Sequence, residues 1–336
     1  MFKLFKKMPR WLRKTIAITF LVTIAISLIV VLFIGILFVG KFTQHAKENA
    51  DRNSTYASIV EQLPDRDVGA IKDPLYSDIN GPLYSDKEFS QSERLDSAYR
   101  VDFVDVGYGD CTVLSNGAET MVVDTGDAFG GKLAAKHLRT NGISRISVLV
   151  VTNESNEHIG GLSLLLHDFE VDTLIVPNAN TENEVMKTCI AFAKENGVEV
   201  KTAKALDAWN IGQAQVQILS AKHNVIIRIG LQATSFLLMS DASLEEEMAL
   251  LELDIDVSAT VLKASSHGSA NTSSSNFLKW IAPKYAVVSC DKTVATPNVK
   301  TLNRLYETAV VYRTDKFGTV SVLSDGCEYA LTVAKL

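Results

Sequence analysis

A short valine-rich run that breaks off into polar side chains, within residues 147–162, constrains this chain more than any other stretch. Residues 148–151 are apolar and mostly β-branched, which is typical of a strand buried on both faces, and an apolar pattern of helical spacing begins at Ile159. Between them stands the sequence Thr-Asn-Glu-Ser-Asn-Glu-His. Polar groups at such a junction lie at the carboxyl edge of a sheet, where open α/β folds place their chemistry. The same residues also suit a plain capped turn.

The amino-terminal segment indicates a membrane anchor. Residues 1–14 carry six basic side chains and no acidic one, and residues 15–39 contain no charged residue. A helix of that length spans roughly 37 Å, enough for a hydrocarbon core of about 30 Å with some tilt. By the positive-inside rule we expect a basic cytoplasmic tail over 1–14, a single-pass transmembrane signal anchor in the cell membrane over 15–39 and an extracytoplasmic remainder. A cleaved signal peptide is the alternative, disfavoured by the length of the apolar run.

Residues 40–98 have the composition of a linker, because they are polar, contain several prolines and glycines and show no sustained periodicity. The sequence Pro-Leu-Tyr-Ser-Asp occurs in them twice, at 74–78 and 82–86, either as paired turns or as a contact for a protein partner. The formal net charge of −6 includes the six positive charges of the tail, so the rest of the chain carries about −12. Such a surface repels phosphate backbones on average, which leaves nucleic acid as an alternative partner only.

Residues 99–336 alternate short apolar strands with helical patterns, in two similar halves that each mix hairpins with crossover helices. This alternation predicts an α/β sandwich in which helices cover the sheets, within one domain. We expect helices over 130–141, 181–196, 244–253, 275–281 and 299–308, and a closing hairpin over 319–333. The four cysteines fit no metal-binding spacing, and Cys111 and Cys290 stand in apolar runs, so we expect core residues and no structural disulfide.

Five segments in a fixed order carry a family resemblance. They read Val-Asp-Val-Gly-Tyr-Gly-Asp at 104–110, Val-Asp-Thr-Gly at 123–126, the junction at 152–158, Phe-Leu-Leu-Met-Ser-Asp at 236–241 and Lys-Ala-Ser-Ser-His-Gly-Ser at 263–269. Their order and spacing resemble the metallo-β-lactamase fold, and within it the hydrolase domain of ComEC-type DNA-uptake competence proteins. The resemblance covers about residues 99–335 and implies an αβ/βα sandwich. It also puts Asp124 in the family's buried aspartate position, and Tyr108 where the family has a glutamine.

The resemblance also implies which residues would bind metal. The family's His-x-His/Asp-x-Asp-His motif falls on Asn153, Ser155, Glu157 and His158. Only His158 is intact, although Glu157 keeps the negative charge on a longer arm. The family's bridging aspartate falls on Asp241 and a later histidine on His267. Two metal ions need imidazole and carboxylate groups at both positions, and asparagine and serine bind zinc poorly. The residues left for one metal are therefore Glu157, His158, Asp241 and His267.

Three functions are compatible with this pattern. The leading interpretation is a membrane-anchored extracytoplasmic pseudo-enzyme whose site has lost its metal ions and which binds or regulates. The rival is a hydrolase that cleaves phosphodiesters or nucleic acid with one zinc or manganese ion, with Asp241 and His267 as catalytic residues. The third is a structural partner of a membrane complex that contacts a protein through the linker. If His158 serves recognition, we expect its replacement by alanine to change stability little, because such a residue need not pack the core.

Overall fold

Strands and helices alternate along residues 99–335, the part of the chain that the computed structural model describes, apart from positions 179, 254 and 293–295. The predicted tail, anchor and linker, residues 1–98, lie outside the described residues. None of the described helices is long and apolar enough to cross a membrane.

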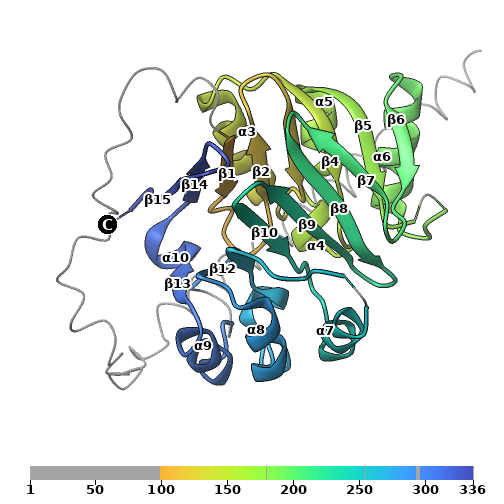
Figure 1. Ribbon diagram of the computed structural model, residues 1–336. Helices are drawn as coiled ribbons and strands as arrows, with labels where there is room; N and C mark the ends of the chain where they lie inside the picture. The colour runs from red at the N-terminus through yellow and green to blue at the C-terminus, as the bar shows by residue number, and fades with distance from the viewer. Residues whose placement is uncertain (1–98, 179, 254, 293–295, 336) are drawn as a thin grey trace, which may run out of the picture. The chain divides into compact units, whose positions relative to one another are not determined.

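Two β-sheets form the centre of this part of the chain (Figure 1). One sheet has eight strands in the spatial order β15-β14-β1-β2-β3-β4-β5-β6, with the bounds β1 Tyr99–Phe103, β2 Thr112–Ser115, β3 Thr120–Val123, β4 Arg145–Val150, β5 Glu170–Val176, β6 Glu199–Thr202, β14 Val320–Ser324 and β15 Tyr329–Val333. The other sheet has seven strands in the order β13-β12-β11-β10-β9-β8-β7, with the bounds β7 Ala208–Ile211, β8 Ala214–Ala221, β9 Val225–Leu231, β10 Thr234–Leu238, β11 Val261–Lys263, β12 Tyr285–Val288 and β13 Val310–Arg313.

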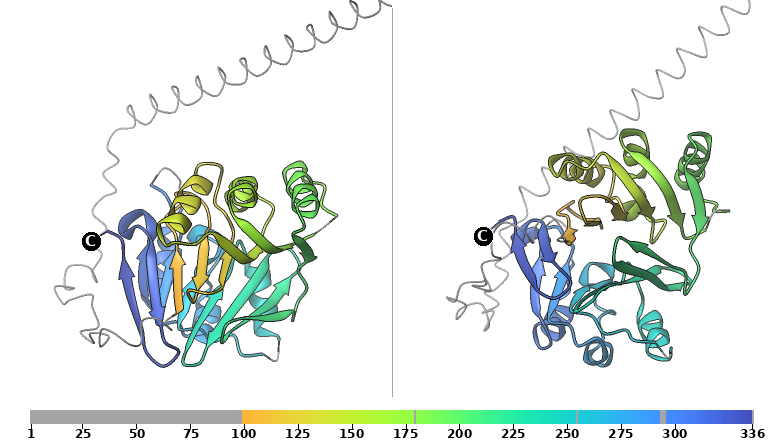
Figure 2. Two further views of the ribbon diagram at one scale, coloured as in Figure 1. Left: turned by 90° about the horizontal axis from the view of Figure 1, so that it is seen from above. Right: turned by 45° about the horizontal axis from the view of Figure 1, so that its top comes forward.

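The helices cover the outer faces of the two sheets (Figures 1 and 2). Those on the eight-stranded sheet are α3 Gly130–Thr140, α4 Asn156–Ile159, α5 Leu162–Asp168 and α6 Glu184–Glu195. Those on the seven-stranded sheet are α7 Leu244–Leu251, α8 Ser275–Ile281 and α9 Val299–Tyr306. A further short helix, α10 Thr314–Phe317, precedes β14, and a 3-10 turn, η2 Ser265–Gly268, follows β11. The predicted α/β sandwich of two sheets faced by helices is confirmed.

Three apolar cores hold these layers together, one between the sheets and one under each helical layer. The strand β4 shows how the sequence supplies two of them, because Val150 packs between the sheets while Leu149 and Val151 pack under the helices. Successive strand residues point to opposite faces, so a run that is apolar throughout can fill both cores. Helix α6 presents one face to the core that contains Leu149 and Val151, through Met186 and Ile190, which are four residues apart.

Both sheets change from antiparallel to parallel pairing along their width. Val123 at the end of β3 pairs with Val150 at the end of β4, and Leu238 at the end of β10 pairs with Lys263 at the end of β11. The carboxyl ends of parallel neighbours meet at one edge of a sheet. The polar segments that follow these strands are therefore brought to the same end of the fold.

Two glycine pairs allow the chain to close around this end. A Cβ atom on Gly161 would lie 2.4 Å from the carbonyl oxygen of Thr125, and one on Gly131 would lie 2.3 Å from the Cα atom of Gly161. Real Cβ atoms do not approach other atoms so closely, so only glycine lets α3 and the turn before α5 touch. The Gly-Gly sequence that follows Ile159 is thus a packing requirement of the fold.

The structure differs from the sequence-based expectation in detail. The helix predicted from Ile159 onward is two pieces, α4 and α5, and the strands β6 and β7 were not predicted. Both strands lie at sheet edges and are largely exposed, so they lack the apolar pattern that marks a buried strand. Cys111 and Cys290 are buried core residues, as predicted, and all four cysteines are free thiols.

Candidate functional site

The loop after β4 is anchored by a buried aspartate from the neighbouring strand. Asp124 directly follows β3, and its carboxylate accepts hydrogen bonds from the backbone N–H and the hydroxyl of Thr152, at 2.8 and 2.6 Å. The hydroxyl oxygen of Thr152 also lies 2.7 Å from that of Ser240, which follows β10 in the other sheet. These bonds join both sheets at the edge where the polar segments meet.

His158 lies between two carboxylates and is fully buried. Its Nδ1 is 2.8 Å from an oxygen of Asp124, and its Nε2 is 3.1 Å from an oxygen of Asp241. Burial alone would lower the pKa of His158, but the charge and hydrogen bond of Asp124, together with the hydrogen bond to Asp241, raise it well above its ordinary value. Burial alone would raise the pKa of Asp241, but the hydrogen bond from His158 lowers it, and the net effect is a lowered pKa. The imidazolium form therefore donates to both carboxylates.

A second buried pair lies beside the first. The ammonium group of Lys263, at the end of β11, donates to Oδ2 of Asp110, and both side chains are about 5% exposed or less. Burial would raise the pKa of Asp110, but the charges of Lys263 and of the nearby histidines hold it well below its usual range. Nδ1 of His267 lies 3.0 Å from the carbonyl oxygen of Ser289 and 3.6 Å from Oδ1 of Asp110.

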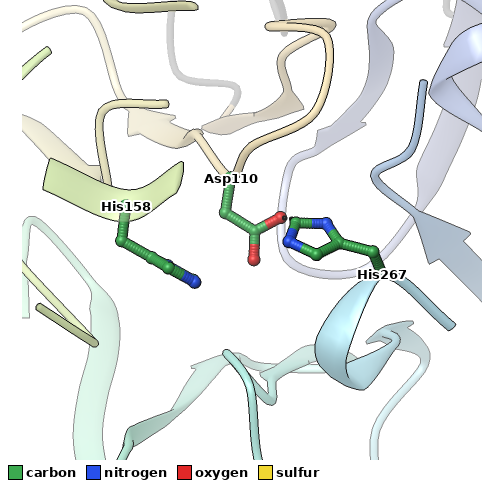
Figure 3. A group of neighbouring side chains, drawn as sticks. All are labelled: Asp110, His158 and His267. Atoms are coloured by element: carbon green, nitrogen blue, oxygen red, sulfur yellow. Dashed lines mark ion pairs between the residues drawn. The ribbon is translucent and has the colours of Figure 1, made fainter. Parts of the chain in front are cut away.

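Three of these side chains converge on one space. The carboxylate of Asp110 lies between the imidazole rings of His158 and His267, which enter from different segments of the chain (Figure 3). One potential ligand atom from each residue lies within 4.8 Å of the other two. Buried carboxylate and imidazole groups at such distances can hold a metal ion of the kind that prefers nitrogen and oxygen ligands.

Unpartnered buried atoms in the same place fit a single cation. Among the described residues, Oδ1 of Asp110, Oδ1 of Asp241 and Nε2 of His267 are buried and have no hydrogen-bond partner. Leaving a buried polar atom without a partner costs roughly 1–3 kcal/mol. Asp110 and His267 belong to the three residues that converge on one space, so their unpartnered atoms are matched to a bound ion or ligand rather than to the protein alone.

Left-handed backbone conformations gather at the same edge. Positive φ angles are found at Asp124 (62°), Ser240 (50°), Ser266 (46°) and His267 (53°), where no glycine relieves the strain. Non-glycine residues rarely adopt such angles, and each costs of the order of 1–3 kcal/mol unless its surroundings compensate. Strained residues cluster at binding and catalytic sites. The backbone thus marks this end of the sandwich independently of its side chains.

Comparison with known proteins agrees with this architecture. The family model described as the metallo-beta-lactamase superfamily matches residues 104–291. The chain belongs to this superfamily. Its curated relatives include ComE operon protein 3 from Bacillus subtilis strain 168, at 26% identity over 67% of this chain, and Recombination protein 2 from Haemophilus influenzae, at 26% identity over 57%. The matches span 33% and 24% of the length of these ComEC-type, competence-related proteins. A solved structure, the metallo-beta-lactamase fold protein YhfI from Bacillus subtilis, is 12% identical, covering 63% of this chain and 96% of YhfI with a TM-score of 0.45.

The superfamily motif residues predicted from the sequence fall into two groups. His158, Asp241 and His267 are all at the site, with His158 in contact with Asp241 and its ring centroid 6.3 Å from that of His267. Glu157 is half-buried and is not part of the group that converges on one space, although its charge acts on Tyr108 beside the site. It contributes its backbone carbonyl instead, which accepts a hydrogen bond from the N–H of Asp110 at 3.1 Å.

The other two motif positions serve the loop itself. Oδ1 of Asn153 accepts a hydrogen bond from the backbone N–H of Ser155 at 2.8 Å, and Nδ2 of Asn153 donates to Asn224 at 2.7 Å. The side-chain amide of Asn224 in turn donates to Glu246 at 2.9 Å. These polar groups close a network between the loop and the first turn of α7.

Asp110 and Tyr108, which belong to segment 104–110, were not predicted as site residues from the sequence. Asp110 ends that segment, and its proximity to His158 and His267 follows only from the folded structure. The ring of Tyr108 lies 4.5 Å from that of His267, and burial together with the charges of Glu157 and other carboxylates raises its pKa. The phenol is therefore a protonated hydrogen-bond donor beside the site. The only sequence signal was that both residues belong to a segment that carries the family resemblance.

Proposed function

We propose that this chain is a membrane-anchored, extracytoplasmic member of the metallo-β-lactamase superfamily that no longer performs two-metal hydrolysis and acts by binding or regulation. The anchor rests on the uncharged residues 15–39 and the basic residues that precede them. The kinship with ComEC-type proteins makes a role connected with competence the first to test.

The observation that carries the proposal is the use of Asn153. In the family this position carries a metal-binding histidine, but here both polar ends of the side chain are engaged, by Ser155 and by Asn224. A neutral amide is a poor zinc ligand even when free. Since Ser155 stands at the next ligand position, one of the two metal positions has lost its donors, and a mechanism that requires two ions loses its basis.

The charged side chains at the remaining position are paired within the protein, with one negative charge in excess. Lys263 neutralises Asp110, and the raised pKa of His158 places a positive ring between Asp124 and Asp241. An arrangement in which each charge has a partner can persist while the chain is used for recognition.

A second candidate, a hydrolase with a single metal ion, is favoured by one observation. Nε2 of His267 is buried and has no partner among the described residues. A bound divalent ion there would supply Lewis-acid polarisation of a phosphodiester or of a water molecule. The residues of the chain would orient the substrate, with the phenol of Tyr108 able to donate a hydrogen bond to an anionic oxygen.

The two candidates separate in one experiment. The purified full chain is incubated with single- and double-stranded DNA and with a chromogenic phosphodiester, with zinc or manganese present, and its metal content is measured after dialysis. We expect at most one tightly bound ion per chain and no hydrolysis above that of a His267→Ala variant. Two bound ions with DNA cleavage would overturn the proposal, whereas one ion with cleavage abolished in His267→Ala would establish the second candidate.

A further inference from the structure

The two histidines of the site are held in the same way. Each has its Nδ1 against a fixed acceptor, the carboxylate of Asp124 for His158 and the carbonyl oxygen of Ser289 for His267. A carbonyl oxygen can only accept, so Nδ1 of His267 carries the proton, and in the neutral ring Nε2 presents its lone pair. Histidines that bind metal through Nε2 have their other nitrogen fixed in this manner. His267 is thus oriented as a ligand through Nε2, whereas Nε2 of His158 lies 3.1 Å from Asp241 and binds an ion only by exchanging that contact for the metal.

Asp110 is the acidic group that faces the two rings. Its Oδ1 is buried and has no hydrogen-bond partner, while its Oδ2 accepts from Lys263. Together with His158 and His267 it forms the group whose potential ligand atoms lie within 4.8 Å of one another, and neither Glu157 nor Asp241 is part of that group. The carboxylate that the family motif would supply is therefore replaced, in space, by one from a different segment.

We propose that Asp110, His158 and His267 bind one first-row divalent transition-metal ion, with Asp110 as the carboxylate ligand in place of Glu157. Two imidazole nitrogens with one carboxylate oxygen suit zinc, iron or cobalt, whereas magnesium and calcium favour all-oxygen sites. The potential ligand atoms lie within 4.8 Å of one another, so small side-chain movements suffice for all three to contact one ion. The inference does not depend on whether the chain hydrolyses a substrate.

Lys263 sets the affinity of this site. Its ammonium group holds the carboxylate of Asp110 in place, but it also occupies Oδ2 with a positive charge next to the ion. Like charges repel strongly where both are buried. Replacing Lys263 by methionine, which has a similar length and no charge, leaves the whole carboxylate of Asp110 to the metal and tightens binding.

Cobalt titration of the full chain tests the assignment, because Co²⁺ bound by imidazole and carboxylate absorbs visible light and reports binding without any activity. We expect one Co²⁺ per chain, a loss of affinity of more than about tenfold in Asp110→Asn and in His267→Ala, and a change of less than about twofold in Glu157→Gln. Glu157→Gln is the matched control, since it removes the acid that the family motif would use. No binding by the native chain, or a loss confined to Glu157→Gln, would overturn the proposal.

A second comparison protects the test from misfolding. Asp110→Asn alone leaves the buried ammonium of Lys263 without its partner, which destabilises the fold. The double variant Asp110→Asn/Lys263→Met leaves neither charge unpaired, and in Lys263→Met the carboxylate that loses its partner is the one that the bound metal ion neutralises. We expect Lys263→Met to bind Co²⁺ more tightly than the native chain and the double variant to lose binding. Equal affinity in these two variants would show that Asp110 is not a ligand.

Discussion

Replacing His158 by alanine tests how far the candidate site holds the fold together. If His158 serves recognition, the sequence alone leads us to expect little change in stability, because a residue kept for recognition need not pack the core. The structure removes that premise, since the side chain is fully buried and bridges Asp124 and Asp241, which come from the two different sheets. Alanine would leave both carboxylates without their imidazole partner.

The size of the effect follows from these contacts. Removing one partner of a buried ion pair costs about 3–5 kcal/mol. Asp124 keeps its two hydrogen bonds from Thr152, and the side chain of Asp241 is 22% exposed and can be solvated, so the low end of that range applies. We expect a loss of about 3 kcal/mol in the free energy of unfolding. For a domain of this size that corresponds to a decrease in Tm of about 6–12 °C.

Thermal melting followed by circular dichroism, with a chelator present so that no metal contributes, measures this change. His223→Ala is the matched control, because His223 is exposed, and its Tm should stay within about 2 °C of the native value. His158→Asn should lose less than His158→Ala, since the amide nitrogen of asparagine can replace Nδ1 as the donor to Asp124. A decrease of less than about 2 °C in His158→Ala would refute the bridging role and leave His158 as a dispensable residue.

Three further predictions concern other parts of the chain. Burial raises the pKa of Asp102, but the hydrogen bond from His137 and the charge of a nearby arginine hold this pKa below its ordinary value. The ionised carboxylate of Asp102 therefore stabilises the fold above about pH 4, and this stabilisation is lost as the pH falls through the lowered pKa. Asp102→Asn should therefore cost about 1–3 kcal/mol at pH 7 by denaturant unfolding, and a cost that did not shrink in acid would contradict this origin. Asn153→His should lower stability by about 1 kcal/mol without raising the zinc content, and a gain of a second ion would contradict the loss of that metal position. Protease added to intact cells should digest the part of the chain that follows residue 40, because we expect that part to lie outside the membrane. A carboxyl-terminal domain that resists this protease until the cells are opened would contradict the predicted orientation.

The fold could be predicted because its signals are local. Apolar runs of strand length, amphipathic spacing and stop signals are legible residue by residue, and both faces of a strand such as β4 are recorded in one unbroken apolar run. The edge strands β6 and β7 escaped because an exposed strand needs no apolar side chains. The buried aspartate Asp124, by contrast, was placed by the family resemblance alone.

The site was predictable only in part, because its contacts join distant segments. His158, Asp241 and His267 were found through motif positions, and the structure brings them to one place. Glu157 was assigned because it stands at the aspartate position of the family motif, next to His158, yet adjacent residues on a helix point about 100° apart, so the position of one does not fix that of the other. The pairing of Asp110 with Lys263 spans the two sheets, and no local pattern records it.

Asn153 and His267 differ in how the fold satisfies their polar groups. The side chain of Asn153 makes ordinary loop contacts, and its hydrogen bonds stabilise the turn. At His267 the opposite holds, since the residue keeps a left-handed backbone and an unpartnered nitrogen, each of which costs free energy. Substitutions that relieved such costs would stabilise the fold and would accumulate in a site without any use. The presence of these costs at His267, next to the buried charges of Asp110 and Lys263, is what we expect if this side of the site binds a ligand or an ion.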